Sequence, residues 1–160
     1  MTYEEAYYFE ILLSLGITEG YEEWLNNYLE IENPISDVVL ELSFNTVDIP
    51  KSISILSNFR YNRERKIDEK VVCENLRLYL KDKYKSKSAD EKEISILMYR
   101  MANIIGDPES FNCKIWNSFY YMSDYCSLAE NHNISFEQFK KAFYDYLIDG
   151  KDLNMNFYKN

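Results

Sequence analysis

TYEEAYYFEILLSLG, residues 2–16, contains the start, the body and the end of an α-helix in one short run. Thr2 and Glu5 have the spacing of a capping box, in which side-chain oxygens satisfy the free backbone N–H groups at a helix start. Gly16 follows, where a helix end favours a residue that accepts positive φ. Between them, apolar side chains recur with the helical period of about 3.6 residues: Ala6, Phe9, Leu12 and Leu13. This stretch predicts a helix from residue 2 to about residue 15.

The same order of start signal, apolar period and stop recurs along the chain. The start signals are Ser36, Asp48 followed by Pro50, Ser88 with Glu91, Asp107 with Pro108, and Ser135 with Gln138. The predicted helices span about 18–32, 36–44, 48 to beyond 59, 67–85, 88–105, 108–130 (the longest) and 135 to just before Gly150.

These signals predict an all-α fold, a compact multi-helix bundle of about seven to eight helices with short loops. Residues 1–160 are expected to form a single helical domain. The tail, 151–160, either frays or packs Phe157 and Tyr158 onto the body.

Each predicted helix has one apolar face. The side chains expected to point inward are Ile53, Leu56 and Phe59; Val72, Leu76, Tyr79 and Leu80; Phe111, Ile115, Phe119, Met122 and Cys126; and Phe136, Phe139, Phe143 and Leu147. The opposite face of the 67–85 helix carries Lys70, Glu74, Arg77 and Lys81, spaced for ion pairs within the helix.

Composition excludes several classes of protein. A hydrophobic content of 46% is too high for a disordered chain. No apolar run reaches the roughly 18 residues of a transmembrane helix. The start, MTYEEAYYFE, carries acids where a signal peptide needs positive charge. We therefore expect a soluble, cytoplasmic protein with no membrane partner.

The residues most often used in catalysis are few and lie in unremarkable positions. His132 is the only histidine and lies between a predicted helix end and the next helix cap, where solvent-facing histidines are common. Cys73, Cys113 and Cys126 lie inside predicted helices at no metal-like spacing, as small buried side chains would.

Two carboxylate pairs share helix faces, Asp37 with Glu41 and Asp145 with Asp149. A di-metal helix bundle would combine such pairs with Glu-x-x-His motifs, and none occurs here. The four glycines are too dispersed to form a phosphate-binding loop. We expect no enzyme activity, no metal and no cofactor.

Two basic stretches, RYNRERK at 60–66 and KDKYKSK at 81–87, interleave bases with tyrosine as a nucleic-acid-binding surface does. They are short, and Glu64 and Asp82 interrupt them. They also lie at predicted helix ends and in loops, where lysines are easily solvated. With a net charge of −9, the chain is expected to have no nucleic-acid partner.

Charge is distributed unevenly along the chain. Residues 1–50 hold eleven acids and no Lys or Arg, residues 51–92 hold twelve bases and seven acids, and residues 93–160 hold six bases and nine acids. A surface whose only role is to keep the protein soluble usually mixes positive and negative charges, because like charges repel. A surface of one sign accelerates the encounter with a partner of the opposite sign.

YEEWLNNYLE, residues 21–30, lies in the middle of this acidic third. On a helix its aromatic and leucine side chains share one face, which predicts core, while its acids and asparagines share the other. The acidic face is our candidate partner-binding site, together with acids of the flanking helices: Glu4, Glu5, Glu19, Glu22, Glu23, Asn26, Glu30, Asp37 and Glu41.

In size, acidity, helicity and lack of a catalytic signature, the chain resembles the small acidic helical proteins that bacteria make to neutralise toxins. The resemblance implies a non-enzymatic, immunity-like inhibitor that binds a basic protein, such as a nuclease toxin domain. No motif carries the resemblance, so no residue roles are transferred. The alternative is a helical scaffold or adaptor, since Ile-Ser-Ile-Leu recurs at 53–56 and 94–97, a separation that suits a two-helix solenoid repeat.

Overall fold

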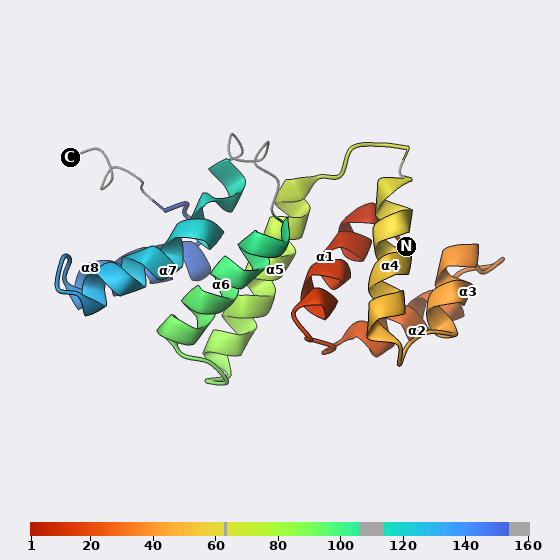
Figure 1. Ribbon diagram of the computed structural model, residues 1–160, viewed down its shortest axis with the longest axis horizontal. Helices are drawn as coiled ribbons and strands as arrows, with labels where there is room; N and C mark the ends of the chain where they lie inside the picture. The colour runs from red at the N-terminus through yellow and green to blue at the C-terminus, as the bar shows by residue number, and fades with distance from the viewer. Residues whose placement is uncertain (63, 106–113, 154–160) are drawn as a thin grey trace. The chain divides into compact units, whose positions relative to one another are not determined.

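The computed structural model describes residues 1–62, 64–105 and 114–153 (Figure 1). Across these ranges the chain forms eight α-helices and one short 3₁₀-helix, with no strand, so the predicted all-α fold class is confirmed. The helices are α1 (Tyr3–Ser14), α2 (Tyr21–Ile31), α3 (Asp37–Ser43), α4 (Ile49–Tyr61), α5 (Glu69–Lys85), α6 (Glu91–Ile105), η2 (Lys114–Trp116), α7 (Asn117–Glu130) and α8 (Phe136–Leu147).

The chain divides into two compact units, Met1–Val72 and Cys73–Asn160, here called unit 1 and unit 2. The boundary falls inside α5, which contributes its first turn to unit 1 and the rest to unit 2. The expectation of a single domain stays a prediction.

Unit 1 begins with the predicted capping box. The Thr2 hydroxyl accepts a hydrogen bond from the Glu5 N–H, and the Glu5 carboxylate accepts one from the Thr2 N–H. Asp48 caps α4 in the same way, by accepting from the Lys51 N–H, with Pro50 in the first turn. In both places the sequence signal located the helix start correctly.

The core of unit 1 lies where α1 packs along α4 and where α2 and α3 close against them (Figure 1). The four apolar residues predicted to face inward from α1 are all buried. The cluster at the centre contains Ala6, Phe9, Leu13, Tyr21, Leu25, Val39, Leu42, Ile55 and Leu56.

Ser36 occupies the predicted N-cap position of α3, but its side chain makes no cap hydrogen bond to the helix. Its hydroxyl and its N–H instead donate to the carboxylate of Glu32, at 2.7 and 3.0 Å. A charged acceptor forms a stronger hydrogen bond than a helix N–H donor offers, which explains why the hydroxyl turns away from the cap.

In unit 2, α6 begins with a capping box two residues later than predicted. The Asp90 carboxylate, rather than the Ser88 hydroxyl, accepts from the Glu93 N–H, and the Glu93 carboxylate in turn accepts from the Asp90 N–H. The Ser88 hydroxyl donates to the Lys83 carbonyl and helps to close the end of α5. At the start of α8, Ser135 and Gln138 form the capping box as predicted.

The helix predicted over 108–130 is observed from Asn117 to Glu130, after the short η2 turn. Its expected start at Asp107 and Pro108, and the expected core residue Phe111, lie outside the described residues. The longest helix of the described ranges is α5, with 17 residues.

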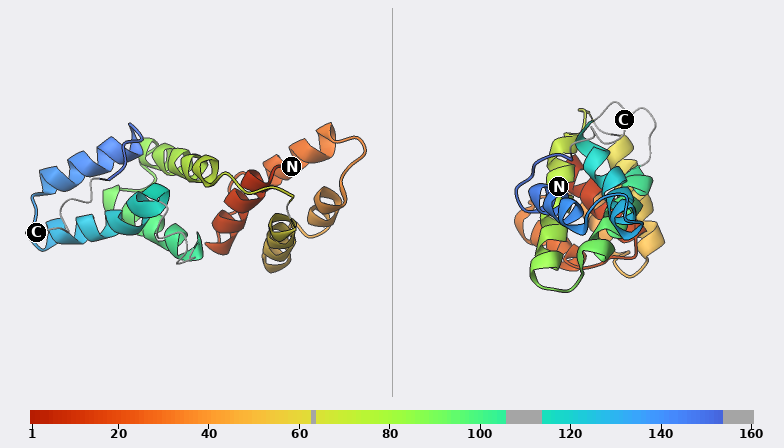
Figure 2. Two further views of the ribbon diagram at one scale, coloured as in Figure 1. Left: turned by 90° about the horizontal axis from the view of Figure 1, so that it is seen from above. Right: turned by 90° about the vertical axis from the view of Figure 1, so that its left-hand side faces the viewer.

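The core of unit 2 lies where α7 packs between α6 and α8, and α7 and α8 run side by side (Figures 1 and 2). Helix α5 adds to it through Tyr84, whose ring meets Phe143 edge-on with centroids 5.3 Å apart. Its fully buried large side chains include Leu76, Leu80, Trp116, Phe119, Phe139 and Phe143.

Two predicted faces are corrected by the structure. Phe136 is 47% exposed, because it is the first residue of α8 and has no preceding turn to cover it. Arg77, expected on the solvent face of α5, is only 7% exposed. Its guanidinium donates to the Leu147 carbonyl and to Glu74, so hydrogen bonds compensate for its burial.

The start of the tail is attached to unit 2. The Leu153 N–H donates to the hydroxyl of buried Ser118 at 3.0 Å, and Leu153 itself is buried. The expected packing of Phe157 and Tyr158 lies outside the described residues.

The two Ile-Ser-Ile-Leu segments face their cores differently. In α4 the last two residues, Ile55 and Leu56, are buried, whereas in α6 the first two, Ile94 and Ser95, are buried. Equivalent repeats would bury equivalent positions, because each would stack on its neighbour in the same way. The recurrence therefore gives no support to a solenoid.

Candidate protein-binding surface

The acidic helix predicted at residues 18–32 begins later, at Tyr21. Gly20 precedes it with φ of 75°, a left-handed conformation that a side chain would resist. Of the candidate residues, Glu22, Glu23, Asn26 and Glu30 lie on the exposed face of α2, and Glu19 is exposed in the turn before it.

The other face of α2 is aromatic and belongs to the core, as predicted. Tyr21 is buried, and Trp24 and Tyr28 are half-buried against the core of unit 1. Phe9 of α1 contacts both Tyr21 and Trp24, with ring centroids 5.7 and 4.4 Å away. This packing fixes the rotation of α2, so its acids must point to solvent.

Glu4 does not lie on this acidic face. It is 6% exposed, and its carboxylate accepts two hydrogen bonds from Arg65 and one from the Asp68 N–H. The hydrogen bonds from Arg65 outweigh burial and hold the pKa of Glu4 at about 2. Glu4 is therefore not available to a partner at the surface of unit 1.

Glu5 and Glu41 are also engaged within unit 1. Burial would raise the pKa of Glu5, but hydrogen bonds from Tyr28 and Thr2 bring it below its ordinary value. Glu41 lies 3.7 Å from the ammonium of Lys51, with both side chains about half exposed. Asp37, the remaining candidate, is exposed in the first turn of α3.

The basic stretch at 60–66 neutralises acids of the first helix. Arg60 donates to both carboxylate oxygens of Glu10, at 2.7 and 3.0 Å, and its guanidinium lies over the rings of Tyr7 and Tyr61. Arg65 binds Glu4 in the same two-bond geometry. The fold thus compensates some of the acidity of residues 1–50 with cations from the end of α4 and the loop after it.

Most of the net charge nevertheless remains in unit 1. Its sequence contains 14 acids and six bases, a net charge of −8, whereas unit 2 contains 13 acids and 12 bases, a net charge of −1. Among the described residues, no Lys or Arg pairs with Glu22, Glu23 or Glu30. The outer face of α2 is therefore a surface of one sign.

A second feature of unit 1 was not predicted from the sequence. Of the twelve large apolar side chains that are exposed in the described ranges, five fall between residues 31 and 47. We call them the α3 apolar surface: Ile31, Ile35, Leu40, Phe44 and Val47, which are 72, 40, 42, 78 and 94% exposed.

A signal for this surface is present in the sequence. The segment DVVLELSF, 37–44, has apolar side chains all around a helix of only seven residues. Such a helix can bury one face, and it buries Val39 and Leu42. Leu40 and Phe44, four residues apart, then share an outward face.

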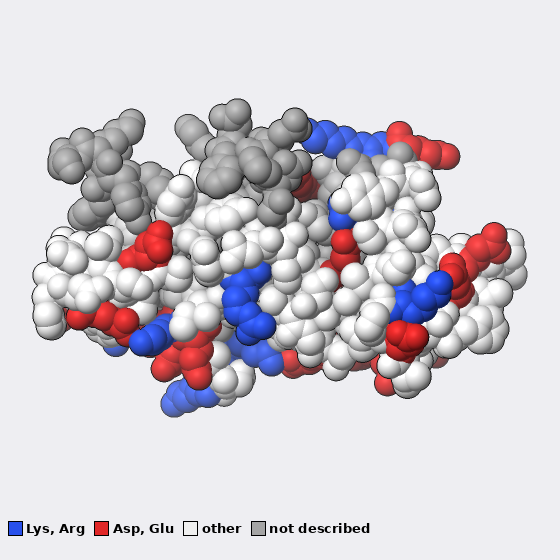
Figure 3. All heavy atoms as spheres, in the orientation of Figure 1, with Lys and Arg blue, Asp and Glu red and all other residues white. Residues whose placement is uncertain are grey.

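Carboxylates border the α3 apolar surface, and Figure 3 shows acidic atoms beside uncharged ones over this helix. Asp37, Glu41 and Asp48 are exposed around it. Lys51 is the only Lys or Arg in residues 1–59, and it already lies beside Glu41.

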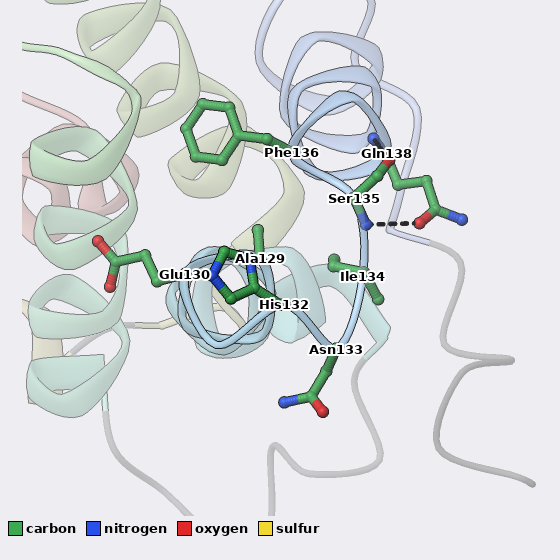
Figure 4. A pocket seen from close by; sticks show the side chains of 8 residues that line it. All are labelled: Ala129, Glu130, His132, Asn133, Ile134, Ser135, Phe136 and Gln138. Carbon is green, nitrogen blue, oxygen red and sulfur yellow. Dashed lines mark hydrogen bonds between the residues drawn. The ribbon is translucent and has the colours of Figure 1, made fainter.

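The single histidine lines a separate pocket of about 600 Å³ in unit 2 (Figure 4). His132 is exposed two residues after the end of α7, with a left-handed φ of 60°. Ser135, on the same pocket wall, uses its hydroxyl and its N–H to cap α8 with Gln138. Glu130 pairs with Lys92.

The second carboxylate pair and the second basic stretch are likewise bound locally. Asp145 pairs with Lys141 and lies near Lys151, which also binds Asp149. Lys81 donates to the Ile148 carbonyl. Nowhere in the described ranges do three His, Cys, Asp or Glu side chains gather as a metal site would require.

Two further findings bear on function. Within the part of the chain that the structure describes, no helix is both long enough and apolar enough to span a membrane. Comparison with protein-family models, with curated proteins and with solved structures finds no match for this chain.

Proposed function

We propose that the chain is a non-enzymatic binding protein, and that the acidic face of α2 in unit 1 recognises a basic protein. The immunity-like form of this proposal is an inhibitor that neutralises a basic toxin such as a nuclease. The observation that carries it is the concentration of charge: unit 1 has a net charge of −8, and the exposed acids of α2 have no cationic partner in the described residues.

The physical advantage of such a face is kinetic. A surface of one sign steers a partner of the opposite sign and raises the association rate by about 10- to 1,000-fold at low salt. A nuclease needs a basic cleft to hold the phosphate backbone. An acidic protein that lies in or beside this cleft would exclude the substrate without any chemistry of its own.

The rigid support of α2 suits this role. The aromatic contacts of Phe9 with Tyr21 and Trp24 hold the helix by its inner face. The backbone of α2 is therefore held in place before a partner binds, so only the outer side chains have to be ordered on binding.

The test is to recover a basic partner from the native host at low salt and to measure its association rate with the full chain. Reversing Glu22, Glu23 and Glu30 to Lys should lower the association rate about tenfold or more, and added salt should reduce the remaining difference. The matched control reverses three exposed acids of unit 2, Asp82→Lys, Asp124→Lys and Glu137→Lys, which changes the net charge equally.

The two variants separate a local effect from a global one. If both lower the association rate equally, net charge alone acts and the α2 face has no special role. If neither does, or if the rate is insensitive to salt, the proposal is wrong.

A further inference from the structure

The α3 apolar surface leaves large apolar side chains in contact with water, and the acidic face of α2 does not explain this exposure. Single exposed apolar side chains are normal on soluble proteins. Here five fall within one short part of unit 1, and Phe44 and Val47 are 78 and 94% exposed. Exposed apolar groups that gather in this way usually mark an interaction site.

The local backbone brings two of these side chains to one side, and a third follows in the next turn of the chain. Leu40 and Phe44 are four residues apart on α3 and its C-cap. The chain continues to turn after Phe44, with hydrogen bonds from the Asn45 N–H to the Leu42 carbonyl and from the Asp48 N–H to the Asn45 carbonyl. Val47 follows three residues after Phe44 in this turn and is 94% exposed, and Leu40, Phe44 and Val47 are together called the apolar ridge.

The charge around the ridge selects the partner. Exposed Asp37, Glu41 and Asp48 border it, and Lys51 is held beside Glu41. A segment with Lys or Arg beside its apolar side chains would meet opposite charges, whereas an acidic segment would meet like charges. A second copy of this chain would bring two strongly acidic units together, so self-association is disfavoured by the same repulsion.

The secondary structure selects the form of the partner segment. An extended peptide binds most readily by adding to the edge of a sheet. The described residues of unit 1 contain helices and no strand, so no such edge is present. A helix satisfies its own backbone hydrogen bonds and needs only apolar contact along one face.

We propose that the α3 apolar surface, centred on Leu40, Phe44 and Val47, is a docking site for a basic amphipathic helix of another protein. The proposal rests on the proposed function, in which the acidic face of α2 attracts a basic partner. In this arrangement charge sets the rate of encounter, and the apolar ridge sets how long the complex lasts.

The probe is a labelled synthetic helix of leucine and lysine with its leucines along one face, and fluorescence anisotropy reports its binding to the full chain. Two companion peptides carry glutamate in place of lysine, or serine in place of leucine. The chain variants are Leu40→Ser, Phe44→Ser and Val47→Lys. The matched control is Leu78→Ser in α5, since Leu40 and Leu78 are both 42% exposed helical leucines.

We expect the leucine–lysine helix to bind, and each companion peptide to bind at least about tenfold more weakly. Leu40→Ser and Phe44→Ser together should weaken binding by about tenfold or more and should act mainly on the dissociation rate. Leu78→Ser should change binding by less than about twofold. Circular dichroism checks that each variant folds, and Val47→Lys alters a side chain too exposed to affect folding.

Several results would overturn the proposal: no binding of the leucine–lysine helix, equal binding of the glutamate peptide, or equal effects of Leu40→Ser and Leu78→Ser. A dimer in sedimentation that Phe44→Ser dissolves would assign the surface to a second copy instead. If reversal of Glu22, Glu23 and Glu30 slows binding while the apolar variants change nothing, this inference fails and the proposed function stands. If only the apolar variants matter, the proposed function fails instead.

Discussion

Arg65 donates one hydrogen bond to each carboxylate oxygen of Glu4, both at 2.7 Å, across 61 positions of sequence. The two residues come from the acidic start of the chain and from its first basic stretch. Glu4 is buried and Arg65 is largely exposed, so the pair draws the loop after α4 down onto α1. The pair also removes one acid from the surface that the charge pattern had suggested.

Acidification should remove the contribution of Glu4 to stability. Its pKa is about 2 in the folded protein, below its ordinary value near 4.5, because Arg65 binds the charged form. A lowered folded-state pKa stabilises the fold above the unfolded-state pKa, and this stability is lost as the pH falls toward 2. We expect Glu4→Gln to be less stable than the native chain at pH 7, with the difference shrinking between about pH 4.5 and 2.

This prediction is measured by urea unfolding of fluorotryptophan-labelled protein, because Trp24 reports on unit 1 and Trp116 on unit 2. The Trp24 signal should change its midpoint in Glu4→Gln. The control, Glu22→Gln, alters an exposed side chain and should keep the native midpoint at neutral pH. A difference between Glu4→Gln and the native chain that is the same at pH 7 and pH 3 would refute the role given to Arg65.

Two helix ends should become more stable when their left-handed residue is replaced by glycine. Lys87 and His132 have φ of 57° and 60°, and each follows its helix at the position where the N–H of the next residue bonds to the carbonyl five residues before it. A side chain at such a position costs about 1 kcal/mol. Lys87→Gly and His132→Gly should each raise the free energy of unfolding by about this amount.

Thermal unfolding tests this directly. The control, Lys85→Gly, places glycine inside the last turn of α5 and should destabilise by about 0.5–1 kcal/mol. Were all three variants to lower the melting temperature, the backbone conformation at residues 87 and 132 would not be the controlling factor.

Replacing Arg77 should destabilise unit 2. Its guanidinium donates to the Leu147 carbonyl at the end of α8, one of the last carbonyls of the helix, which have no N–H partner within the helix itself. Arg77→Met keeps the apolar stem and removes the donor, and should cost about 2 kcal/mol. The Trp116 signal in urea unfolding measures it.

Lys81→Met is the comparison, since Lys81 donates to the neighbouring Ile148 carbonyl from a less buried position. It should cost less than Arg77→Met, because water can replace a donor near the surface. Equal losses would mean that burial does not distinguish the two sites.

Cys73 should resist thiol reagents in the folded protein. Burial raises its pKa to about 12, although a contact with the Tyr146 hydroxyl at 3.7 Å acts in the opposite direction. The thiolate is the reactive form. The rate at which Cys73 is modified near pH 8 should therefore depend on unfolding of the protein rather than on the pH. A chain with Cys113→Ser and Cys126→Ser isolates the reaction, and rapid labelling without denaturant would contradict the prediction.

Much of the local structure could be predicted from the sequence, because helix starts and apolar periods depend on residues that are close along the chain. Thr2 with Glu5, Asp48 and Ser135 with Gln138 cap the helices that they predicted. The errors arose where a serine hydroxyl donates to another acceptor instead of accepting from the N–H groups of its helix. Ser36 and Ser88 were expected to cap, yet Glu32 and the Lys83 carbonyl took their hydroxyl groups, and Asp90 capped α6 instead.

The candidate surface was only partly predictable, because it depends on contacts between residues that are far apart in the sequence. Which acids keep their charge exposed depends on cations that approach from distant positions, as Arg60 approaches Glu10. Glu22, Glu23 and Glu30 remained outside because the aromatic face of their own helix, visible in the sequence, faces the core. The α3 apolar surface was not predicted, because the sequence of a short helix with apolar residues on all sides does not indicate which side will be covered.

The sequence by itself determined the all-α class, the approximate position of each helix and the strongly acidic character of residues 1–50. These follow from side-chain chemistry and from contacts within a turn or two. Tertiary structure alone decided that Glu4 is buried, that Arg77 lies inside unit 2, and that Leu40 and Phe44 face solvent. Each of these depends on which helix packs against which, and packing joins residues that the sequence keeps far apart.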